Sequence, residues 1–428
     1  MVPSHERYLN QSAAARQINA PPDTGLSMVV VIPCHNEPDL LGVLQYLSQC
    51  APSLGQAEII VVINASAAHP ETVHKQNRLS LGQAEAWLSA RSGHWLPVHL
   101  LHLPDLPNRH AGVGLARKVG MDEALRRLAD VGRAEDGLIV CYDADCRCSP
   151  NYFTGIEAHF AAHPDSPGTS LHFEHPLDQA EMEQRGFGSL GQALGQAEFD
   201  GIAAYELHLR YHVRAQKQIG FPYAFQTIGS AMAVRAWAYV KQGGMNRRHA
   251  GEDFYFLQKI SWLGQITELT DVTVYPSPRL SDRVPFGTGK AIGEYIEAGL
   301  QSTYPLQAYR DVEWLIRQID SLWEDGRFSG SLPKPLGRFL GSEFTEQIIP
   351  EIRQNSTNEK SFQKRFFRWF NAFRLMKYLN YARDEAYGTA PVSTATRALL
   401  NEMGIAAENE NAVELLRRYR QLDRDRKT

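Results

Sequence analysis

The chain lacks any apolar run long enough to cross a membrane. None of its 428 residues belongs to a stretch of about 18 consecutive apolar residues, the length that a transmembrane helix needs. Residues 1–27 also lack the apolar core of a secretory signal peptide. We therefore predict no transmembrane segment and a cytoplasmic location, with residues 1–27 forming a mobile tail or an arm packed on the surface.

Cysteine is scarce and is not arranged as a framework. The five cysteines are an odd number without regular spacing, which favours a reducing compartment over a disulfide scaffold. Cys141, Cys146 and Cys148 cluster, but they lack the paired two-residue gaps of a zinc site. We expect them to be small buried or loop residues.

An excess of positive charge and an early glycine-rich loop are also missing. The net charge of −4 argues against a nucleic-acid partner, because phosphate binding needs clustered Lys and Arg.

A dinucleotide-dependent oxidoreductase would carry Gly-x-Gly-x-x-Gly just after its first strand. Residues 33–36 contain no glycine, and the later segment at Gly112 has Arg117 where the third glycine belongs. The absent opening loop also argues against a sugar-1-phosphate nucleotidyltransferase.

What the sequence does contain is an alternation of buried strands and amphipathic helices. Residues 28–32 and 58–64 are β-branched apolar runs that predict buried strands, and Pro33 is expected to stop the first. Residues 38–49 between them place leucines on one face, which predicts a helix. A strand, a helix and a strand at this spacing form a βαβ unit, so the sheet should be parallel.

Two aspartates follow another predicted strand, residues 138–140. Asp143 and Asp145 lie one residue apart where that strand ends, and ligands of open α/β sheets bind at this edge. Carboxylate oxygens suit Mg²⁺ or Mn²⁺, which is usually held by one or two carboxylates and substrate phosphates. The alternative is a simple turn, because turns are rich in Asp.

A second acidic pair, Glu252 and Asp253, stands before a helix-like run that extends to Trp262. Asp253 is predicted to be the N-cap of that helix. A carboxylate held there would suit a general base, although two acids at a helix start are also favoured by the helix dipole alone.

Together these segments resemble the family 2 glycosyltransferases of the GT-A fold. The resemblance rests on four motifs in order over residues 28–292: Pro33-Cys34-His35-Asn36-Glu37, Gly112-Val113-Gly114-Leu115-Ala116-Arg117, Asp143-Ala144-Asp145 and Glu252-Asp253. The family often has Asp at the end of the second strand, where this chain has Asn64. The identity of the donor base therefore stays open.

The resemblance implies a metal-dependent, non-processive glycosyltransferase that moves a sugar from a nucleotide-diphosphate donor to an acceptor hydroxyl. It makes Asp145 the principal ligand of Mn²⁺ or Mg²⁺, Asp143 a ribose or metal contact, Asp253 the base of an inverting transfer, and Glu252 an acceptor-binding or orienting group. The donor would contact Pro33, Asn36, Glu37, Asn64, Gly112, Arg117, Asp143 and Arg283. Two alternatives remain: a retaining GT-A transferase, or a sugar-nucleotide-binding protein without transferase activity.

The predicted fold class is α/β of the GT-A type, a Rossmann-like and mostly parallel sheet flanked by helices, with a C-terminal helical region. The expected domains are the tail 1–27, a glycosyltransferase domain 28–299 and a helical region 300–428. The glycosyltransferase domain divides into a nucleotide-sugar half, 28–177, and an acceptor half, 178–299. The acceptor is unknown, and the formation of a homo-oligomer is left open.

Three further segments allow two interpretations each. The loop 277–290, with Arg279, Arg283 and Lys290, suits a flexible cover over a diphosphate or a solvated surface loop. His208, His212 and His249 would line the acceptor site or be structural. Residues 362–381 interleave aromatic and basic residues, which is typical of a helix in peripheral contact with anionic lipid or of a buried seam that docks the C-terminal helices onto the catalytic domain. The wide spread of the apolar residues favours the seam.

Overall fold

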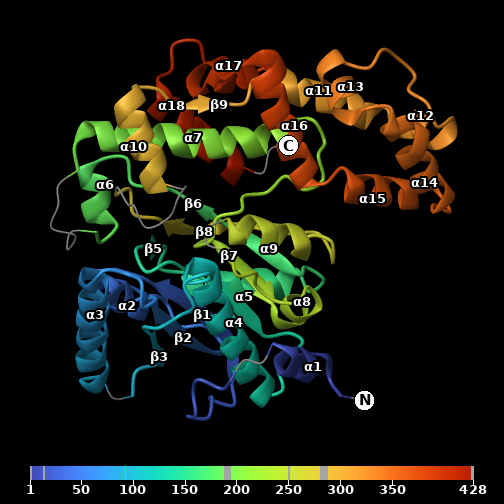
Figure 1. Ribbon diagram of the computed structural model, residues 1–428. Helices are drawn as coiled ribbons and strands as arrows, with labels where there is room; N and C mark the ends of the chain where they lie inside the picture. The colour runs from blue at the N-terminus through green and yellow to red at the C-terminus, as the bar shows by residue number, and fades with distance from the viewer. Residues whose placement is uncertain are drawn as a thin grey trace. The chain divides into compact units, whose positions relative to one another are not determined.

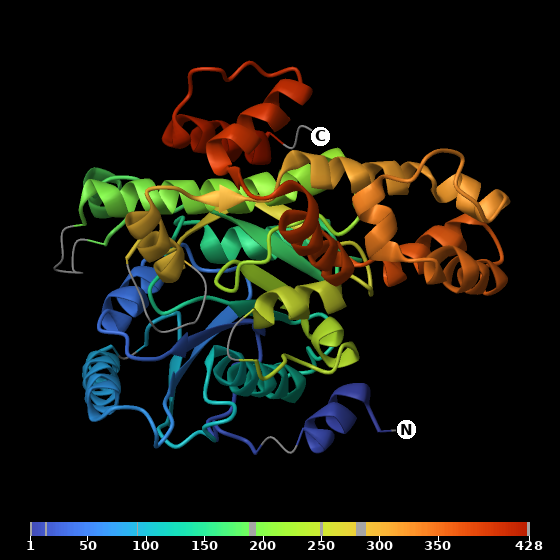
Figure 2. The ribbon, with the colours of Figure 1, turned by 45° about the horizontal axis from the view of Figure 1, so that its top comes forward.

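The computed structural model describes residues 2–12, 15–91, 93–187, 194–248, 251–279 and 288–425, with the backbone alone described at 288–290 (Figures 1 and 2). Contacts divide the chain into two compact units. The first, here the sheet unit, comprises Met1–Phe199 and Thr227–Ile292, and the second, the helical unit, comprises Asp200–Gln226 and Gly293–Thr428. The segment Asp200–Gln226 thus groups with the C-terminal helices.

The sheet unit is built on an eight-stranded sheet in the described residues, with the order β3-β2-β1-β4-β7-β6-β8-β5. Its strands are β1 (Leu26–Cys34), β2 (Gln56–Asn64), β3 (Val98–Leu103), β4 (Leu138–Cys141), β5 (Arg147–Cys148), β6 (Gly168–Phe173), β7 (Met232–Arg235) and β8 (Thr267–Tyr275). The first four strands of that order are mutually parallel, and β6 and β8 are parallel to each other. β7 and β5 run antiparallel to their neighbours.

Helices flank this sheet: α1 (Ser4–Gln11), α2 (Leu40–Ser48), α3 (Glu71–Ser89), α4 (Val113–Asp130), α5 (Tyr152–Ala162), α6 (Gln179–Gln184), α8 (Ala236–Lys241) and α9 (Glu252–Ile260). The predicted α/β class is confirmed, with a mostly parallel sheet flanked by helices and a helical region toward the C-terminus. The predicted βαβ unit is present as β1, α2 and β2.

The first strand continues beyond the point where the sequence predicted its end. Pro33 does not stop β1 but pairs with Val62 of β2, and the strand runs to Cys34. The pairing of β1 with β4 ends earlier, at Val31 and Cys141. Proline is tolerated there because its missing N–H is not needed by a second neighbouring strand.

Helix α4 lies close to the centre of the sheet. A Cβ atom on Gly120 would stand 2.4 Å from the Cγ1 atom of Val31, so only glycine allows this separation of helix and strand. Helix α4 also carries charged residues that are nevertheless buried, among them Asp122 and Glu123. Buried charges need partners, and the N-terminal segment provides them.

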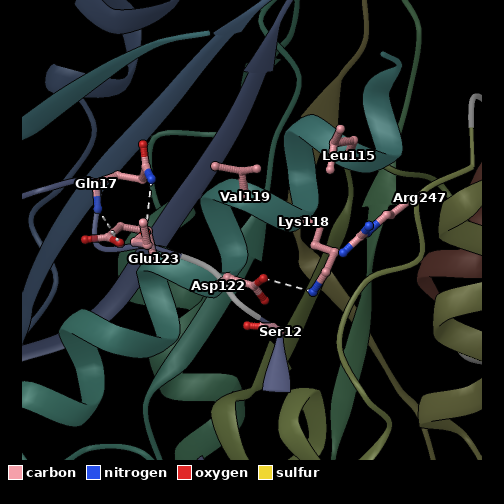
Figure 3. Close-up of a pocket in the computed structure, with 9 residues that line it drawn as sticks. Ser12, Gln17, Leu115, Lys118, Val119, Asp122, Glu123 and Arg247 are labelled. Carbon is pink, nitrogen blue, oxygen red and sulfur yellow. Dashed lines mark hydrogen bonds and ion pairs between the residues drawn. The ribbon is translucent and has the colours of Figure 1, made fainter. Parts of the chain in front are cut away.

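The segment before β1 is an arm that packs along α4 (Figure 3). The hydroxyl of Tyr8 in α1 donates to Asp122 over 2.7 Å, and the backbone N–H groups of Gln17 and Ile18 donate to Glu123 over 3.0 and 3.1 Å. A small pocket of about 120 Å³ remains between the arm and the helix. Of the two expectations for residues 1–27, the described part fits the packed arm.

The helical unit includes most of α7 (Gln196–Gln218) and of α10 (Thr288–Ala298), each of which crosses a boundary between the units. It continues with α11 (Leu306–Arg317), α12 (Ile319–Glu324), α13 (Lys334–Leu340), α14 (Ile349–Gln354), α15 (Glu359–Trp369), α16 (Ala372–Ala382), α17 (Val392–Glu402) and α18 (Ala412–Arg424). Two π-helical turns, η2 (Phe344–Ile348) and η3 (Arg383–Tyr387), and a short antiparallel pair, β9 (Ser302–Thr303) and β10 (Ala390–Pro391), complete it.

The aromatic segment 362–381 is two helices rather than one, because α15 ends at Trp369 and Asn371 caps α16 through its side-chain oxygen. Phe362, Phe366 and Phe370 are fully buried within the helical unit. Phe362 packs on Trp323 with ring centroids 5.6 Å apart. These contacts bury the aromatic side chains inside the helical unit, and the docking seam stays a prediction. In the described residues, no helix is both long and apolar enough to span a membrane.

Candidate active site

The two aspartates of the central motif lie just beyond the end of β4. The N–H of Tyr142 still bonds to Val31 of β1 over 3.1 Å, and the N–H of Cys146 then bonds to the carbonyl of Asp143 over 3.1 Å, which closes a turn. The side chains of Asp143 and Asp145 are 35% and 30% exposed, so both are half-buried and reach solvent. The sheet edge therefore presents two accessible carboxylates.

Arg117 of α4 joins the first of these aspartates to the second acidic pair. Its guanidinium, only 3% exposed, donates through one Nη atom to Glu252 and through the other to Asp143. Burial by itself lowers the pKa of Arg117, but the charges of Asp143 and Glu252 raise it by more than burial lowers it. The net change in the pKa is upward, so the guanidinium keeps its charge. Arg117 is therefore a buried cation held between two carboxylates and not an exposed helix residue.

Two glycines make room for this arrangement. A Cβ atom on Gly229 would lie 2.6 Å from the Nη atoms of Arg117. A Cβ atom on Gly114 would lie 2.3 Å from the carbonyl oxygen of Arg248, in the segment that leads to Glu252. Gly112 is the N-cap of α4 in an extended conformation, five positions before Arg117 along the chain.

The acidic pair begins α9, but Asp253 is not its N-cap as predicted. Gly251 occupies that position with a φ of 69°, a left-handed conformation that glycine adopts without strain, and Asp253 is the second residue of the helix. The Asp253 carboxylate accepts from the N–H of Phe254 over 2.7 Å. Desolvation, and then the charge of the buried Glu252, raise the pKa of Asp253 to about 7.

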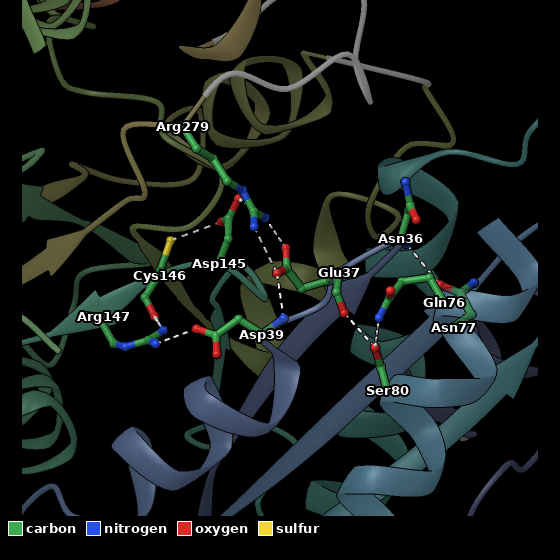
Figure 4. Close-up of polar contacts among 10 residues, drawn as sticks. All are labelled: Asn36, Glu37, Asp39, Gln76, Asn77, Ser80, Asp145, Cys146, Arg147 and Arg279. Atoms are coloured by element: carbon green, nitrogen blue, oxygen red, sulfur yellow. Dashed lines mark hydrogen bonds and ion pairs between the residues drawn. The ribbon is translucent and has the colours of Figure 1, made fainter. Parts of the chain in front are cut away.

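A second arginine joins the other motif aspartate to the loop after β1 (Figure 4). Arg279 donates to both carboxylate oxygens of Glu37, with one contact of 3.1 Å, and to Asp145 over 3.3 Å. Glu37 is fully buried, so this ion pair compensates a charge that would otherwise be costly. The Nε–H group of Arg279 is also buried and has no hydrogen-bond partner in the described residues.

The loop that carries Glu37 is fixed by helix α3 (Figure 4). The side-chain oxygen of Asn77 accepts from the N–H of Asn36 over 2.9 Å, and the hydroxyl of Ser80 donates to the carbonyl of Glu37 over 2.6 Å. Asn36 has a φ of 51°, which is uncommon for a residue other than glycine and which these bonds maintain. The loop is thus held in one conformation by a neighbouring helix.

Arg147 of β5 fixes the same region from the other side. It donates to Asp39, the residue before α2, over 2.5 Å, and to the carbonyls of Cys146 and Gly186 over 3.0 and 3.1 Å. Its guanidinium lies 5.0 Å from the centroid of the Phe187 ring. Both ends of the Asp143–Arg147 segment are therefore anchored by arginines.

The remaining predicted donor contacts lie near these groups or outside the described part. Asn64 ends β2; its carbonyl accepts from the side chains of His35 and Asn77, and its side-chain oxygen is buried with no hydrogen-bond partner in the described residues. Pro33 lies beside it in β1, paired with Val62. Arg283 and His249 lie outside the described residues.

His208 and His212 have structural surroundings in the helical unit. The imidazole of His208 hydrogen-bonds to the hydroxyl of Thr303 over 2.8 Å, and that of His212 to the hydroxyl of Tyr309 over 2.6 Å. Burial lowers the pKa of His208 to about 4 and that of His212 to about 3. Both histidines are therefore uncharged at neutral pH and hydrogen-bonded within the helical unit, as expected for structural residues.

The donor set fits a divalent cation that shares its coordination with a substrate. Asp143 and Asp145 supply hard oxygen ligands, and in the described residues no group of three His, Cys, Asp or Glu side chains is placed to hold a metal alone. Mg²⁺ is typically held by one or two carboxylates together with substrate phosphates and waters. Asp143 and Asp145 would thus supply two of the ligands of such a cation, and substrate phosphates and waters would supply others.

Several residues of this site had no predicted role, namely Asn77, Ser80, Asp39 and Arg147. The sequence did hold one signal: Asn77 and Ser80 share the buried face of α3 with Val73 and Ala84, at spacings of three and four residues. Polar residues on an apolar helical face indicate a buried hydrogen-bond network. The arginine pairings had no such local signal.

No protein-family model and no curated protein sequence matches the chain. Among solved structures, a crystal structure of S. aureus TarS 1-349 in complex with UDP is similar at 14% identity, covers 94% of this chain and 88% of that chain, and gives a TM-score of 0.33. A crystal structure of S. aureus TarS is similar at 14% identity, covers 84% of this chain and 53% of that chain, and gives a TM-score of 0.34. At these TM-scores the likeness carries no argument about function.

Proposed function

We propose that the protein is a glycosyltransferase that moves a sugar from a nucleotide-diphosphate donor to an acceptor hydroxyl, with inversion at the anomeric carbon. The observation that carries the proposal is the linkage of two acidic pairs by Arg117. Asp143, beside Asp145 at the sheet edge, and Glu252, beside Asp253 at the start of α9, bind the same guanidinium. A donor-binding pair and a candidate base therefore belong to one charged cluster.

Asp253 is the proposed general base. As a residue Asp253 is half-buried whereas Glu252 is buried, so Asp253 is the member of the pair more open to an acceptor. In a single displacement the acceptor oxygen attacks the anomeric carbon, Asp253 takes the hydroxyl proton, and the nucleoside diphosphate leaves. A pKa of about 7 matches this role, because proton transfer is most efficient when the pKa of the base lies near the working pH.

Asp145, with Asp143, would hold Mn²⁺ or Mg²⁺, which would stabilise the negative charge of the leaving diphosphate. Arg279 and Arg117 add fixed positive charge beside these carboxylates. The Nε–H of Arg279, which has no partner among the described residues, is a donor that could meet an anionic oxygen. Glu37 keeps that guanidinium in place, since a buried carboxylate without its partner would be strongly destabilising.

The binding test is calorimetric titration with UDP and GDP, each with and without Mn²⁺. We expect one of them to bind much more tightly with the metal, and Asp145→Asn to remove that gain. Asp136→Asn is the matched control, because Asp136 is an exposed acid in an ion pair with Arg133. Equal affinity of Asp145→Asn and the wild-type protein with Mn²⁺ would contradict the proposal.

The catalytic test is the slow hydrolysis of nucleotide-sugar donors, followed by transfer once an acceptor is found. Asp253→Asn should lower turnover by ~10²–10⁴-fold with nucleotide affinity retained. Binding without hydrolysis or transfer in the wild-type protein would favour a sugar-nucleotide-binding protein. An NMR spectrum of the product with the anomeric configuration of the donor would favour a retaining transferase instead.

A further inference from the structure

Two of the five cysteines in the sheet unit are in direct contact. Cys50 follows the end of α2, and Cys148 lies in β5, three residues after Asp145. Their sulfur atoms are 3.7 Å apart, although the residues are separated by 98 positions in the chain. All five cysteines are free thiols and buried. Nothing in the glycosyl-transfer chemistry requires two adjacent thiols at this place.

The other described thiol contacts are of a different kind. Cys141 lies 3.8 Å from the sulfur of Met121, and Cys146 lies 3.7 Å from a carboxylate oxygen of Asp145. A methionine sulfur and a carboxylate cannot form a disulfide with a thiol. Among the contacts described, Cys50 with Cys148 is therefore the pair suited to covalent bonding.

The backbone around the pair already connects the two segments. The N–H of Ala51, next to Cys50, bonds to the carbonyl of Pro150, two residues after Cys148, over 2.9 Å. At the other end of α2, Arg147 binds Asp39. A disulfide needs an S–S separation of about 2.05 Å, so the sulfurs must approach by roughly 1.7 Å, a distance within the reach of side-chain rotation.

We propose that Cys50 and Cys148 form a redox-sensitive dithiol site, which a peroxide converts into an intramolecular disulfide. The Cys50 sulfur attacks one peroxide oxygen and becomes a sulfenic acid while the other oxygen leaves as water. The Cys148 sulfur then attacks the Cys50 sulfur and releases a second water molecule. Two thiols lose two electrons and two protons, and one peroxide is reduced to two waters.

The two thiols differ in a way that supports this order of events. A hydrogen bond from Cys148 lowers the pKa of Cys50 despite the opposing effect of burial, whereas burial raises the pKa of Cys148 well above its ordinary value. Cys50 therefore has more thiolate character and reacts first. Because Cys50 is only 4% exposed, oxidation proceeds at the rate of local opening at the end of α2.

The test uses the full-length reduced protein, treated with a small molar excess of hydrogen peroxide. The protein is then denatured and alkylated with N-ethylmaleimide, and its mass is measured by mass spectrometry to count the adducts. The reduced protein should carry five adducts and the oxidised protein three, with a single cross-linked peptide pair containing Cys50 and Cys148. Cys50→Ser should prevent the cross-link. Cys146→Ala, which changes the thiol nearest to Cys148 in sequence, should leave it intact.

Three results would overturn the proposal: five adducts after treatment, a cross-link between other cysteines, or over-oxidation of Cys50 without a cross-link. Peptide mapping of the wild-type protein decides among them even if a variant fails to fold. The oxidised protein should also melt roughly 5 °C higher than the reduced one, because the cross-link closes a long loop in the unfolded chain. A lower melting temperature would show that the pair is not preformed for the bond.

Discussion

Replacing Arg117 by methionine tests the charged cluster that defines the site. Methionine has a similar length and no charge, so the variant fills most of the space and removes both ion pairs. Asp143 and Glu252 would then face each other near Asp253 without a compensating cation. Glu252 is only 2% exposed, so water cannot substitute for the lost guanidinium.

Breaking a buried ion pair by removing one partner typically costs about 3–5 kcal/mol. The entropy of unfolding is about 2.1 cal/mol/K per residue, so a chain of 428 residues loses roughly 1 °C in melting temperature for each kcal/mol, and we expect Arg117→Met to melt ~3–6 °C lower than the wild-type protein. The arginine itself is 3% exposed, so solvent screening does not reduce this value. The matched control is Arg133→Met, which removes an exposed pair whose side chains are 44% and 53% exposed, and should cost about 0–1 kcal/mol.

The loss should also depend on pH. Burial already raises the pKa of Asp143, and Arg117 opposes that rise, so its removal moves the pKa of the carboxyl further up. A carboxyl whose folded pKa exceeds its unfolded pKa binds more protons when folded, and the stability of the variant falls as pH rises above about 4. Differential scanning calorimetry should therefore find a larger deficit at pH 8 than at pH 5. A deficit under 1 kcal/mol that does not change with pH would refute the reasoning.

Three further outcomes are expected. Gly229→Ala should destabilise the protein and weaken nucleotide binding, measured by thermal shift and titration, because its Cβ atom would lie 2.6 Å from the guanidinium of Arg117. The kcat/KM of transfer should rise with pH through about 7 as Asp253 loses its proton, and a flat profile would exclude it as the base. Burial lowers the pKa of His208 to about 4 and that of His212 to about 3, so the unfolded protein binds protons more readily than the folded one. The free energy of unfolding should therefore fall by roughly 2 kcal/mol for each histidine between pH 6.5 and pH 5. Replacement of both histidines by glutamine should remove this pH dependence, as measured by calorimetry.

The sequence by itself determined the strands of the first half and the places where polar residues leave them. β-branched runs predicted β1 and β2, and the parallel βαβ unit followed from their spacing. The position of Asp143 and Asp145 after a buried strand could also be predicted from the neighbouring residues alone, because an apolar run ends where polar side chains reach solvent. The roles of these residues in donor binding stay predictions.

Only the tertiary structure decided which charges meet. Arg117 and Glu252 are 135 residues apart, and Arg279 and Glu37 are 242 residues apart, distances over which no local pattern carries information. Their pairing depends on the strand order, in which the antiparallel β7 lies between β4 and β6. The N-cap of α9 was also decided by context. An aspartate favours that position locally, but the left-handed Gly251 caps the helix, and Asp253 is its second residue and half-buried. Short-range sterics and hydrogen bonding determine where each helix and strand forms. The site is assembled when segments far apart in the chain pack together, and the burial of the whole core determines that packing.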